Sequence, residues 1–211
     1  MRIRRAEMPI FLVNVLYILV FGGMALSPPA DREFAIYGLV IIVLFALILA
    51  TQRRVEFPAI ILWGLTLWGF LHMAGGEVRI GQGRLYDIVL VPIFTVGDVT
   101  VFRYDHLIHT VGFGVSTRVC FHLLKPYLAE RVRSRAVLSV LVALMGMGLG
   151  AFNEVLELGV SLIDPQSGVG GYYNNAFDLV FNTVGAALAV LLLNVRGRMC
   201  SDRVAGDQEA Q

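Results

Sequence analysis

Five ionisable side chains lie within otherwise apolar stretches of the sequence: Asp105, His109, Glu154, Glu157 and Asp178. A charged group near the centre of a bilayer costs about 2.5 to 3.5 kcal/mol on insertion scales, so such residues usually have a function. Four carboxylates close together would also repel one another. We therefore expect them to share protons, to pair with the histidine or to hold a cation.

Carboxylate oxygens and an imidazole nitrogen together form a ligand set that suits zinc, manganese or iron. We predict a site for a divalent metal ion, with ligands from Asp105, His109, Glu154, Glu157 and Asp178. Glu154 and Glu157 are also the catalytic candidates, because one of them could remain as a general base. His72 and Asn182 are further candidate site residues.

The spacing of these residues indicates that they share helix faces. Asp105 and His109 are four residues apart, Glu154 and Glu157 three, and Asp178 and Asn182 four, so each pair lies on one side of a helix. Following each face along the chain leads to small residues, which let membrane helices approach closely. They are Gly112, Ser116, Gly146, Gly150, Gly185 and Ala189. The pattern predicts three helices that pack tightly at one end and enclose a cavity at the other.

Each candidate also has a structural explanation that the sequence leaves open. Asp105 is suited to the positive end of a helix dipole, and His72 and His109 to a membrane interface. The two glutamates near a helix end could be protonated or could reach towards the headgroups. Asp178 could be an ordinary acid in the first turn of a helix that Asn174 and Asn175 cap.

The composition places these residues in a membrane protein. Of 211 residues, 57% are hydrophobic and only 16% are charged, and the mean hydropathy is +0.72, which is unlike a soluble globular domain. A formal net charge of +1 gives no electrostatic reason to expect a nucleic acid partner. Membrane lipids are the expected partners, and the oligomeric state stays open.

Six segments have the roughly 20 apolar residues that a membrane-spanning helix needs: 8–26, 34–51, 57–74, 104–123, 136–163 and 175–195. The predicted fold class is thus all-α, a polytopic membrane bundle of about six transmembrane helices. Basic residues cluster before the first segment and after every second one, so both termini are predicted to be cytoplasmic. The first segment resembles a signal peptide, but we interpret it as an uncleaved helix.

The remaining parts of the chain complete the predicted organisation. Residues 1–198 form one transmembrane domain, and 199–211 form a disordered cytoplasmic tail. Residues 75–103 form a long external connection whose apolar stretch, Ile88 to Val96, is too short to span a membrane. We interpret that stretch as interfacial or re-entrant, and the connection as a possible lid. Cys120 and Cys200 belong to no CxxC motif and are interpreted as unpaired thiols.

Four sequence pieces resemble those of a known family: LHMAGG at 71–76, RYDHLIH at 103–109, AFNEVLELG at 151–159 and NAFDLVFNTVGA at 175–186. Their order resembles the YjdF-like family of uncharacterised prokaryotic inner-membrane proteins and, more distantly, VanZ-like proteins. The resemblance covers about residues 57–190 and implies a six-helix fold in the inner (cytoplasmic) membrane of a prokaryotic cell. It singles out His72, Asp105, His109, Glu154, Glu157 and Asp178, and Asn182 fits the VanZ-like pattern.

Two positions depart from that pattern. His106 stands where a basic residue, often arginine, is expected, and Ile108 stands where glycine is usual. The resemblance to YjdF-like proteins implies no particular activity. VanZ-like proteins are associated with glycopeptide tolerance, which points only to the cell envelope.

Three function classes follow from these observations. The first is a membrane enzyme that acts on a lipid or lipid-linked envelope substrate and that could use zinc, manganese or iron. The second is a transporter or proton-coupled carrier, and the third is a non-catalytic membrane protein that senses an envelope component. Residues 137–150 and 184–194 contain no ionisable group, so the sequence offers no polar route through the inner half of the bundle.

Overall fold

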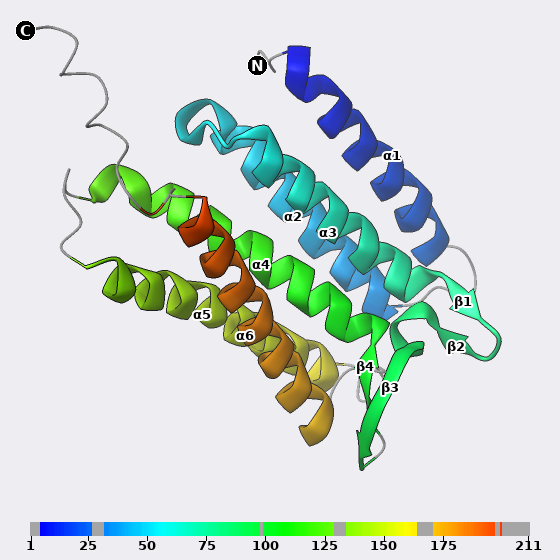
Figure 1. Cartoon of the computed structure of the whole chain (residues 1–211). Helices are drawn as coiled ribbons and strands as arrows, with labels where there is room; N and C mark the ends of the chain where they lie inside the picture. The colour runs from blue at the N-terminus through cyan, green and yellow to red at the C-terminus, as the bar shows by residue number, and fades with distance from the viewer. Residues whose placement is uncertain are drawn as a thin grey trace, which may run out of the picture.

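The computed structural model describes residues 5–26, 32–97, 99–128, 134–163, 171–196 and Met199. Six helices in this part of the chain are long and apolar enough to cross a membrane (Figure 1). They are α1 (Met8–Ala25), α2 (Arg32–Val55), α3 (Ala59–Glu77), α4 (Tyr104–Leu124), α5 (Arg135–Ile163) and α6 (Tyr172–Val195). Each coincides with one of the six predicted segments, which confirms the predicted helical membrane bundle.

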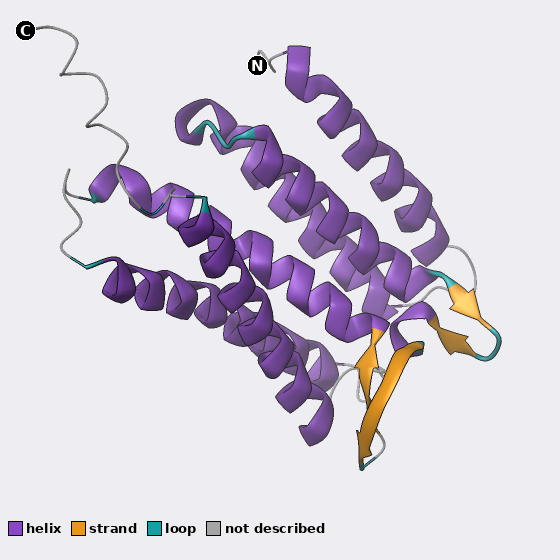
Figure 2. Cartoon of the chain, viewed as in Figure 1, coloured by secondary structure: helices purple, strands orange, loops and turns teal. Residues whose placement is uncertain are grey.

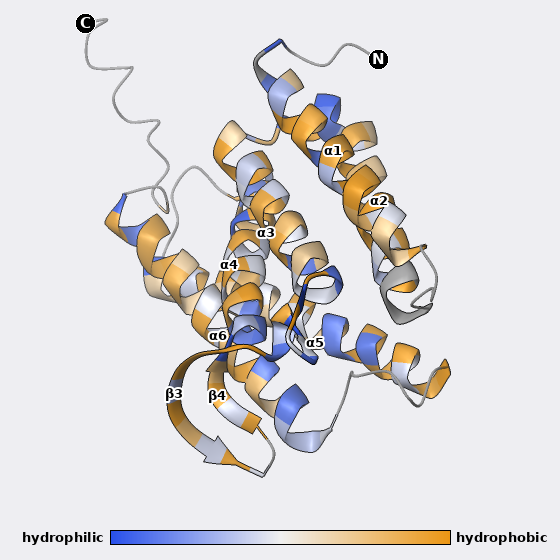
Figure 3. Ribbon diagram, turned by 90° about the vertical axis from the view of Figure 1, so that its right-hand side faces the viewer, coloured by the Kyte–Doolittle hydropathy of each residue, from blue (hydrophilic) through white to orange (hydrophobic). Residues whose placement is uncertain are grey.

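Helix α4 lies at the centre of the bundle, between two groups of helices (Figure 1). It packs against α3 on one side and against α5 and α6 on the other, while α1 packs against α2 and α3. Within the described residues, α5 makes no extended interface with α2 or α3. Most residues of the helices are hydrophobic (Figure 3), and side chains such as Leu12, Leu19 and Leu162 are exposed, as expected for helices that contact lipid.

Close contacts between backbones hold α4, α5 and α6 together. A Cβ atom at Gly185 of α6 would collide with the carbonyl oxygen of Thr110 and would lie 2.9 Å from the backbone nitrogen of Gly114, both on α4. A Cβ atom at Gly150 of α5 would lie 2.8 Å from the Cβ of Asn182. Gly150 and Gly185 therefore let these three helices approach closely, as predicted, whereas Gly112 faces the ring of Trp68 on α3 instead.

The connection between α3 and α4 folds into two antiparallel hairpins (Figure 2). Strands β1 (Arg79–Ile80) and β2 (Gly83–Arg84) form the first, and β3 (Val89–Val96) and β4 (Val99–Arg103) form the second, with the short 3-10 helix η2 (Leu85–Asp87) between them. The apolar stretch Ile88 to Val96 is thus largely a strand. Its β-branched residues and its phenylalanine favour this conformation. After the strand, Gly97 turns the chain with a φ of +61°.

The second hairpin packs beside the start of α6. The rings of Phe94 and Phe177 lie 6.0 Å apart, and Gly97 leaves room for the ring of Tyr173. Leu90, Ile93 and Phe94 are nevertheless exposed. An interfacial position of β3 and a lid function of the connection both stay predictions.

The first turn of α1 and the last turn of α6 lie at the same end of the bundle, and the hairpins lie at the opposite end (Figure 1). Helix α1 is part of the bundle, because Asn14 donates a hydrogen bond of 2.7 Å to Thr66 of α3. Cys120 is a buried free thiol. Met199 is buried near Phe121, whereas the rest of the predicted tail, including Cys200, lies outside the described residues.

Candidate functional site

His109 lies at the centre of a cluster built by α4, α5 and α6 near the hairpin end of the bundle. Its Nε2 is 3.5 Å from an oxygen of Asp105, one turn earlier on α4, and 3.7 Å from Oδ1 of Asp178 on α6. Its Nδ1 is 3.7 Å from Oε1 of Glu154 on α5. Glu157 of α5 completes the cluster. Two overlapping groups in it could each hold a metal ion, because their ligand atoms lie within 4.8 Å of one another. One group is Asp105, His109 and Asp178, and the other is His109, Glu154 and Glu157.

The cluster is buried, and two of its carboxylate oxygens lack a hydrogen bond. Asp178 is 0% exposed, His109 6% and Glu154 7%. Oδ1 of Asp178 and Oε2 of Glu154 have no hydrogen-bond partner among the described residues. A buried carboxylate oxygen without a partner is destabilising, and more so when the group is ionised. These oxygens therefore need a proton or a cation.

Asn182 determines how the imidazole of His109 is oriented. Its amide nitrogen donates to Oε1 of Glu154 at 3.4 Å, so its amide oxygen faces Nδ1 of His109, at 2.9 Å. That oxygen can only accept, and Nδ1 therefore carries the hydrogen. In the neutral imidazole Nε2 then has the lone pair, and Nε2 faces Asp105 and Asp178. Histidines that bind metal commonly have their second nitrogen held by such a hydrogen bond.

The distances around Nε2 suit a metal ion better than a direct hydrogen bond. Two ligands of a tetrahedral zinc ion, each about 2.1 Å from the metal, lie about 3.4 Å apart. The separations from Nε2 to Asp105 and Asp178 are 3.5 and 3.7 Å. Three protein ligands would leave a coordination position for water or substrate, which is typical of catalytic sites. The donor set and its spacing therefore fit a divalent ion.

Two asparagines support the acids from one turn earlier on the same helices. Asn174 donates a 2.7 Å hydrogen bond to Oδ2 of Asp178, and Asn153 donates one of 2.7 Å to Oε1 of Glu157. Asn174 in turn accepts a hydrogen bond from the guanidinium of Arg103. Neither asparagine is among the site residues predicted from the sequence, although the four-residue spacing of each Asn and acid pair is a signal that could have indicated them.

His106 lies outside the cluster. It is fully buried, its Nδ1 accepts a hydrogen bond of 3.1 Å from the backbone N–H of Arg103, and its ring stacks on Phe181 with centroids 4.4 Å apart. It therefore helps to cap the start of α4 and fixes α4 against α6. These contacts explain how a histidine is accommodated at this position.

His72 lies across a cavity from the cluster, in contact with the connection between α3 and α4. The hydroxyl of Tyr86 donates to the backbone carbonyl of His72 at 2.9 Å and also lies 2.9 Å from its Nδ1. Burial, together with the carboxylates of Asp105 and Glu157, holds the pKa of Tyr86 well above its ordinary value. The phenol thus stays protonated and links η2 to α3. His72 therefore forms part of the wall of the cavity.

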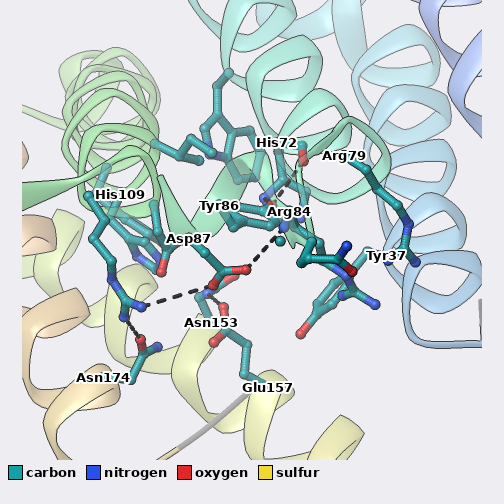
Figure 4. Close-up of a pocket in the computed structure, with 17 residues that line it drawn as sticks. Tyr37, His72, Arg79, Arg84, Tyr86, Asp87, His109, Asn153, Glu157 and Asn174 are labelled. Atoms are coloured by element: carbon teal, nitrogen blue, oxygen red, sulfur yellow. Dashed lines mark hydrogen bonds and ion pairs between the residues drawn. The ribbon is translucent and has the colours of Figure 1, made fainter. Parts of the chain in front are cut away.

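The cavity itself has a volume of about 340 Å³ and is lined by residues of five of the six helices and of the connection (Figure 4). Tyr37 of α2, His72 of α3 and Glu157 of α5 contribute to its walls, and Asp105 and His109 line it from α4. Glu154 and Asp178 do not line it and lie behind His109. The cluster therefore reaches the cavity through Asp105, His109 and Glu157, and His72 lies in another wall of the same cavity.

Comparisons with known proteins identify the family but not an activity. No curated protein and no solved structure shows a significant match to the chain. Residues 9–198 match the model of a family described as Predicted membrane protein (DUF2238). This match extends over all six helices and every residue of the cluster. The chain therefore belongs to this family of membrane proteins.

Proposed function

We propose that the protein is a membrane enzyme that holds a divalent metal ion at Asp105, His109 and Asp178. The observation that carries the proposal is the position of Nε2 of His109, which faces two carboxylates beside a cavity that His109 lines. One of the facing oxygens, Oδ1 of Asp178, is buried without a hydrogen bond among the described residues. Zinc, manganese and iron all accept such a ligand set.

The remaining residues have distinct roles in this proposal. Glu157 lines the cavity and is oriented by Asn153, so it is the candidate general base that would take a proton from water or from a substrate group. Glu154 lies behind His109, where it holds Asn182 and, through it, the imidazole. A bound metal ion would polarise the substrate and lower the pKa of a bound water.

A lipid or lipid-linked envelope substrate is supported by the surroundings of the cavity. The cavity has walls from α2 and α3 on one side and from α5 on the other, and within the described residues these helices share no extended interface. The neighbouring surface of α5 exposes apolar side chains, including Phe152 and Val155. A substrate with hydrocarbon chains would be solvated by lipid there while its polar group reaches the metal.

We further propose that the protein lies in the inner membrane of a prokaryotic cell with the cavity facing outwards. The positive-inside rule supports this orientation, since the predicted cytoplasmic loops at the end away from the hairpins carry most of the basic residues. The sequence likeness to YjdF-like inner-membrane proteins supports the location. The more distant VanZ-like resemblance adds only the association with the envelope.

A carrier is the alternative that intramembrane acids most naturally suggest. It would require an alternating route past the cluster to the other side of the membrane. Beyond the cluster, Thr117 and Val142 are 0% exposed, and Gly114 and Gly185 bring the backbones of α4 and α6 into contact. This close packing favours a site that is closed towards the other side of the membrane over a transport pathway.

The proposal predicts metal-dependent turnover of a membrane lipid that requires Glu157. Purified protein in nanodiscs would be incubated with a bacterial lipid extract and zinc, manganese or iron, and the lipids followed by mass spectrometry. Glu157→Gln is expected to lower turnover by at least about 100-fold, the usual effect of losing a general base. Glu7→Gln is the matched control, because both glutamates are 9% exposed and Glu7 lies at the opposite end.

Two results would contradict the enzyme. If the wild-type protein changes no lipid species with any of the three metals, the proposed class of substrate is wrong. If proteoliposomes instead show transport of protons or metal ions that Glu157→Gln abolishes, the carrier is the better description.

A further inference from the structure

The cavity that contains the candidate metal site is also lined by three arginines, which the proposed metal chemistry does not use. Arg79 and Arg84 come from the first hairpin, and Arg103 immediately precedes α4 (Figure 4). We propose that these arginines bind the phosphate group of an anionic membrane lipid whose chains lie between α2 and α3 on one side and α5 on the other. This inference rests on the proposed function, because it names the substrate class of the same site.

The chemistry of the three side chains suits phosphate. A guanidinium group offers several donors in a fixed plane and binds phosphate oxygens in pairs, with charge assisting the hydrogen bonds. In a cavity that is partly shielded from water, such contacts are stronger than on an open surface. Arg79 is exposed, Arg84 is half-buried, and the side chain of Arg103 is 16% exposed.

Arg103 has a donor that its protein contacts leave unpaired. One terminal nitrogen donates to Asn174, and the other lies 4.0 Å from Asp87, whose side chain is 61% exposed. The buried Nε has no hydrogen-bond partner among the described residues. A buried donor without a partner is destabilising, and an anion in the cavity would supply an acceptor.

The cavity is surrounded by charged groups of both signs. The lining contains three arginines and the acids Asp87, Asp105 and Glu157, and Glu154 and Asp178 lie behind His109. The five carboxylates outnumber the three arginines by two, which is the charge of a divalent ion. With a divalent ion bound, the formal charges of these groups sum to zero, so an anionic ligand would meet no net repulsion at the hairpin side.

The arrangement of the helices favours a lipid phosphate over a soluble one. Tyr37 and Trp68 line one wall and Asn153 and Glu157 the other, while α5 makes no extended interface with α2 or α3 within the described chain. A lipid chain could therefore pass between these helices into the bilayer. The phosphate would then lie beneath the first hairpin, within the same cavity as the metal site.

The test measures three ligands against the full-length protein in a non-ionic detergent by isothermal titration calorimetry. Dioctanoyl phosphatidic acid carries both phosphate and chains, dioctanoylglycerol carries the same chains without phosphate, and inorganic phosphate carries no chains. Phosphatidic acid is expected to bind at least about tenfold more tightly than either of the others, since one extra charge-assisted contact is sufficient for that ratio. Arg79→Gln combined with Arg84→Gln is expected to weaken its binding at least about tenfold.

The matched control combines Arg53→Gln with Arg54→Gln, because both arginines are exposed and lie at the end of α2 away from the cavity. It is expected to bind phosphatidic acid as the wild type does. Equal binding of dioctanoylglycerol, or no loss in the hairpin variant, would overturn recognition of phosphate by these arginines. Inorganic phosphate that binds as tightly as phosphatidic acid would overturn the lipid and indicate a soluble phosphate compound.

Metal content measured on the same samples separates this inference from the proposed function. A protein that is loaded with metal but does not bind phosphatidic acid overturns the phosphate site and leaves the metal centre intact. A protein that takes up no metal but binds phosphatidic acid through the hairpin arginines overturns the metal-dependent enzyme. In that case the arginine site stands on its own as a lipid-binding site.

Discussion

Replacing His109 by glutamine is expected to lower the affinity of the protein for zinc or manganese by at least about 100-fold. Removing a metal ligand should cost more than removing a residue that only hydrogen-bonds to a ligand, which typically costs about 10 to 100-fold. His109 supplies the only nitrogen of the cluster and faces Asp105, Asp178 and Glu154 at once. A glutamine side chain is a weak ligand, and it would also lose the oriented contact to Asn182. A competition titration against a chromophoric chelator measures the affinity.

His122→Gln is the control for this substitution. His122 belongs to the same helix but lies near its other end, where its Nε2 is 2.9 Å from the carbonyl oxygen of Val55. The control variant is expected to keep the wild-type affinity. If His109→Gln also keeps it while remaining folded by circular dichroism, the imidazole is not a ligand and the cluster must be stabilised by shared protons.

Replacing Gly185 by alanine is expected to lower the free energy of unfolding by about 3 kcal/mol, the upper part of the usual range for overpacking. A Cβ atom there would collide with the backbone of Thr110 and approach that of Gly114. Backbone cannot rotate away as a side chain can, so α4 and α6 would have to separate. Because Thr110 follows His109 and Gly185 lies one turn after Asn182, the same separation would weaken metal binding.

Gly148→Ala provides the comparison for this prediction. Gly148 lies in α5 with no atom within 4 Å of the position of a Cβ, so alanine there is expected to leave stability unchanged or raise it by up to about 1 kcal/mol. Unfolding in mixed micelles at increasing SDS fraction measures both variants. Equal losses at the two positions would show that the contact between α4 and α6 is not the cause.

The helices could be predicted from the sequence because a membrane imposes a length and an apolar composition on every span. The connection between α3 and α4 is under no such constraint. Its stretch Val89–Val96 is too short to span a membrane. Its residues favour a strand, and pairing with Val99–Arg103 stabilises that strand. Helix α6 begins at Tyr172, whereas the predicted segment begins at residue 175. The prediction began too late because Tyr172, Tyr173 and Asn174 are not apolar enough to be counted in a membrane-spanning segment.

The residues of the cluster could be predicted because residues three or four positions apart on a helix share a face. Their distances could not, and neither could the hydrogen bond by which Asn182 selects Nε2 of His109. The arginines of the cavity were missed for a different reason. Arg79 and Arg84 reach the site only because the first hairpin folds back over it, and spacing within one helix carries no information about such a contact.

Elemental analysis of the purified wild-type protein beside an Asp178→Asn variant tests the central claim most directly. Asp178 is fully buried, and the substitution keeps the shape of the side chain while removing its charge. The metal site predicts a stoichiometric amount of zinc, manganese or iron in the wild type and less than about a tenth of it in the variant, because a neutral amide is a poor ligand for these ions. Absence of metal from both proteins, even after loading with each ion, would contradict the metal centre.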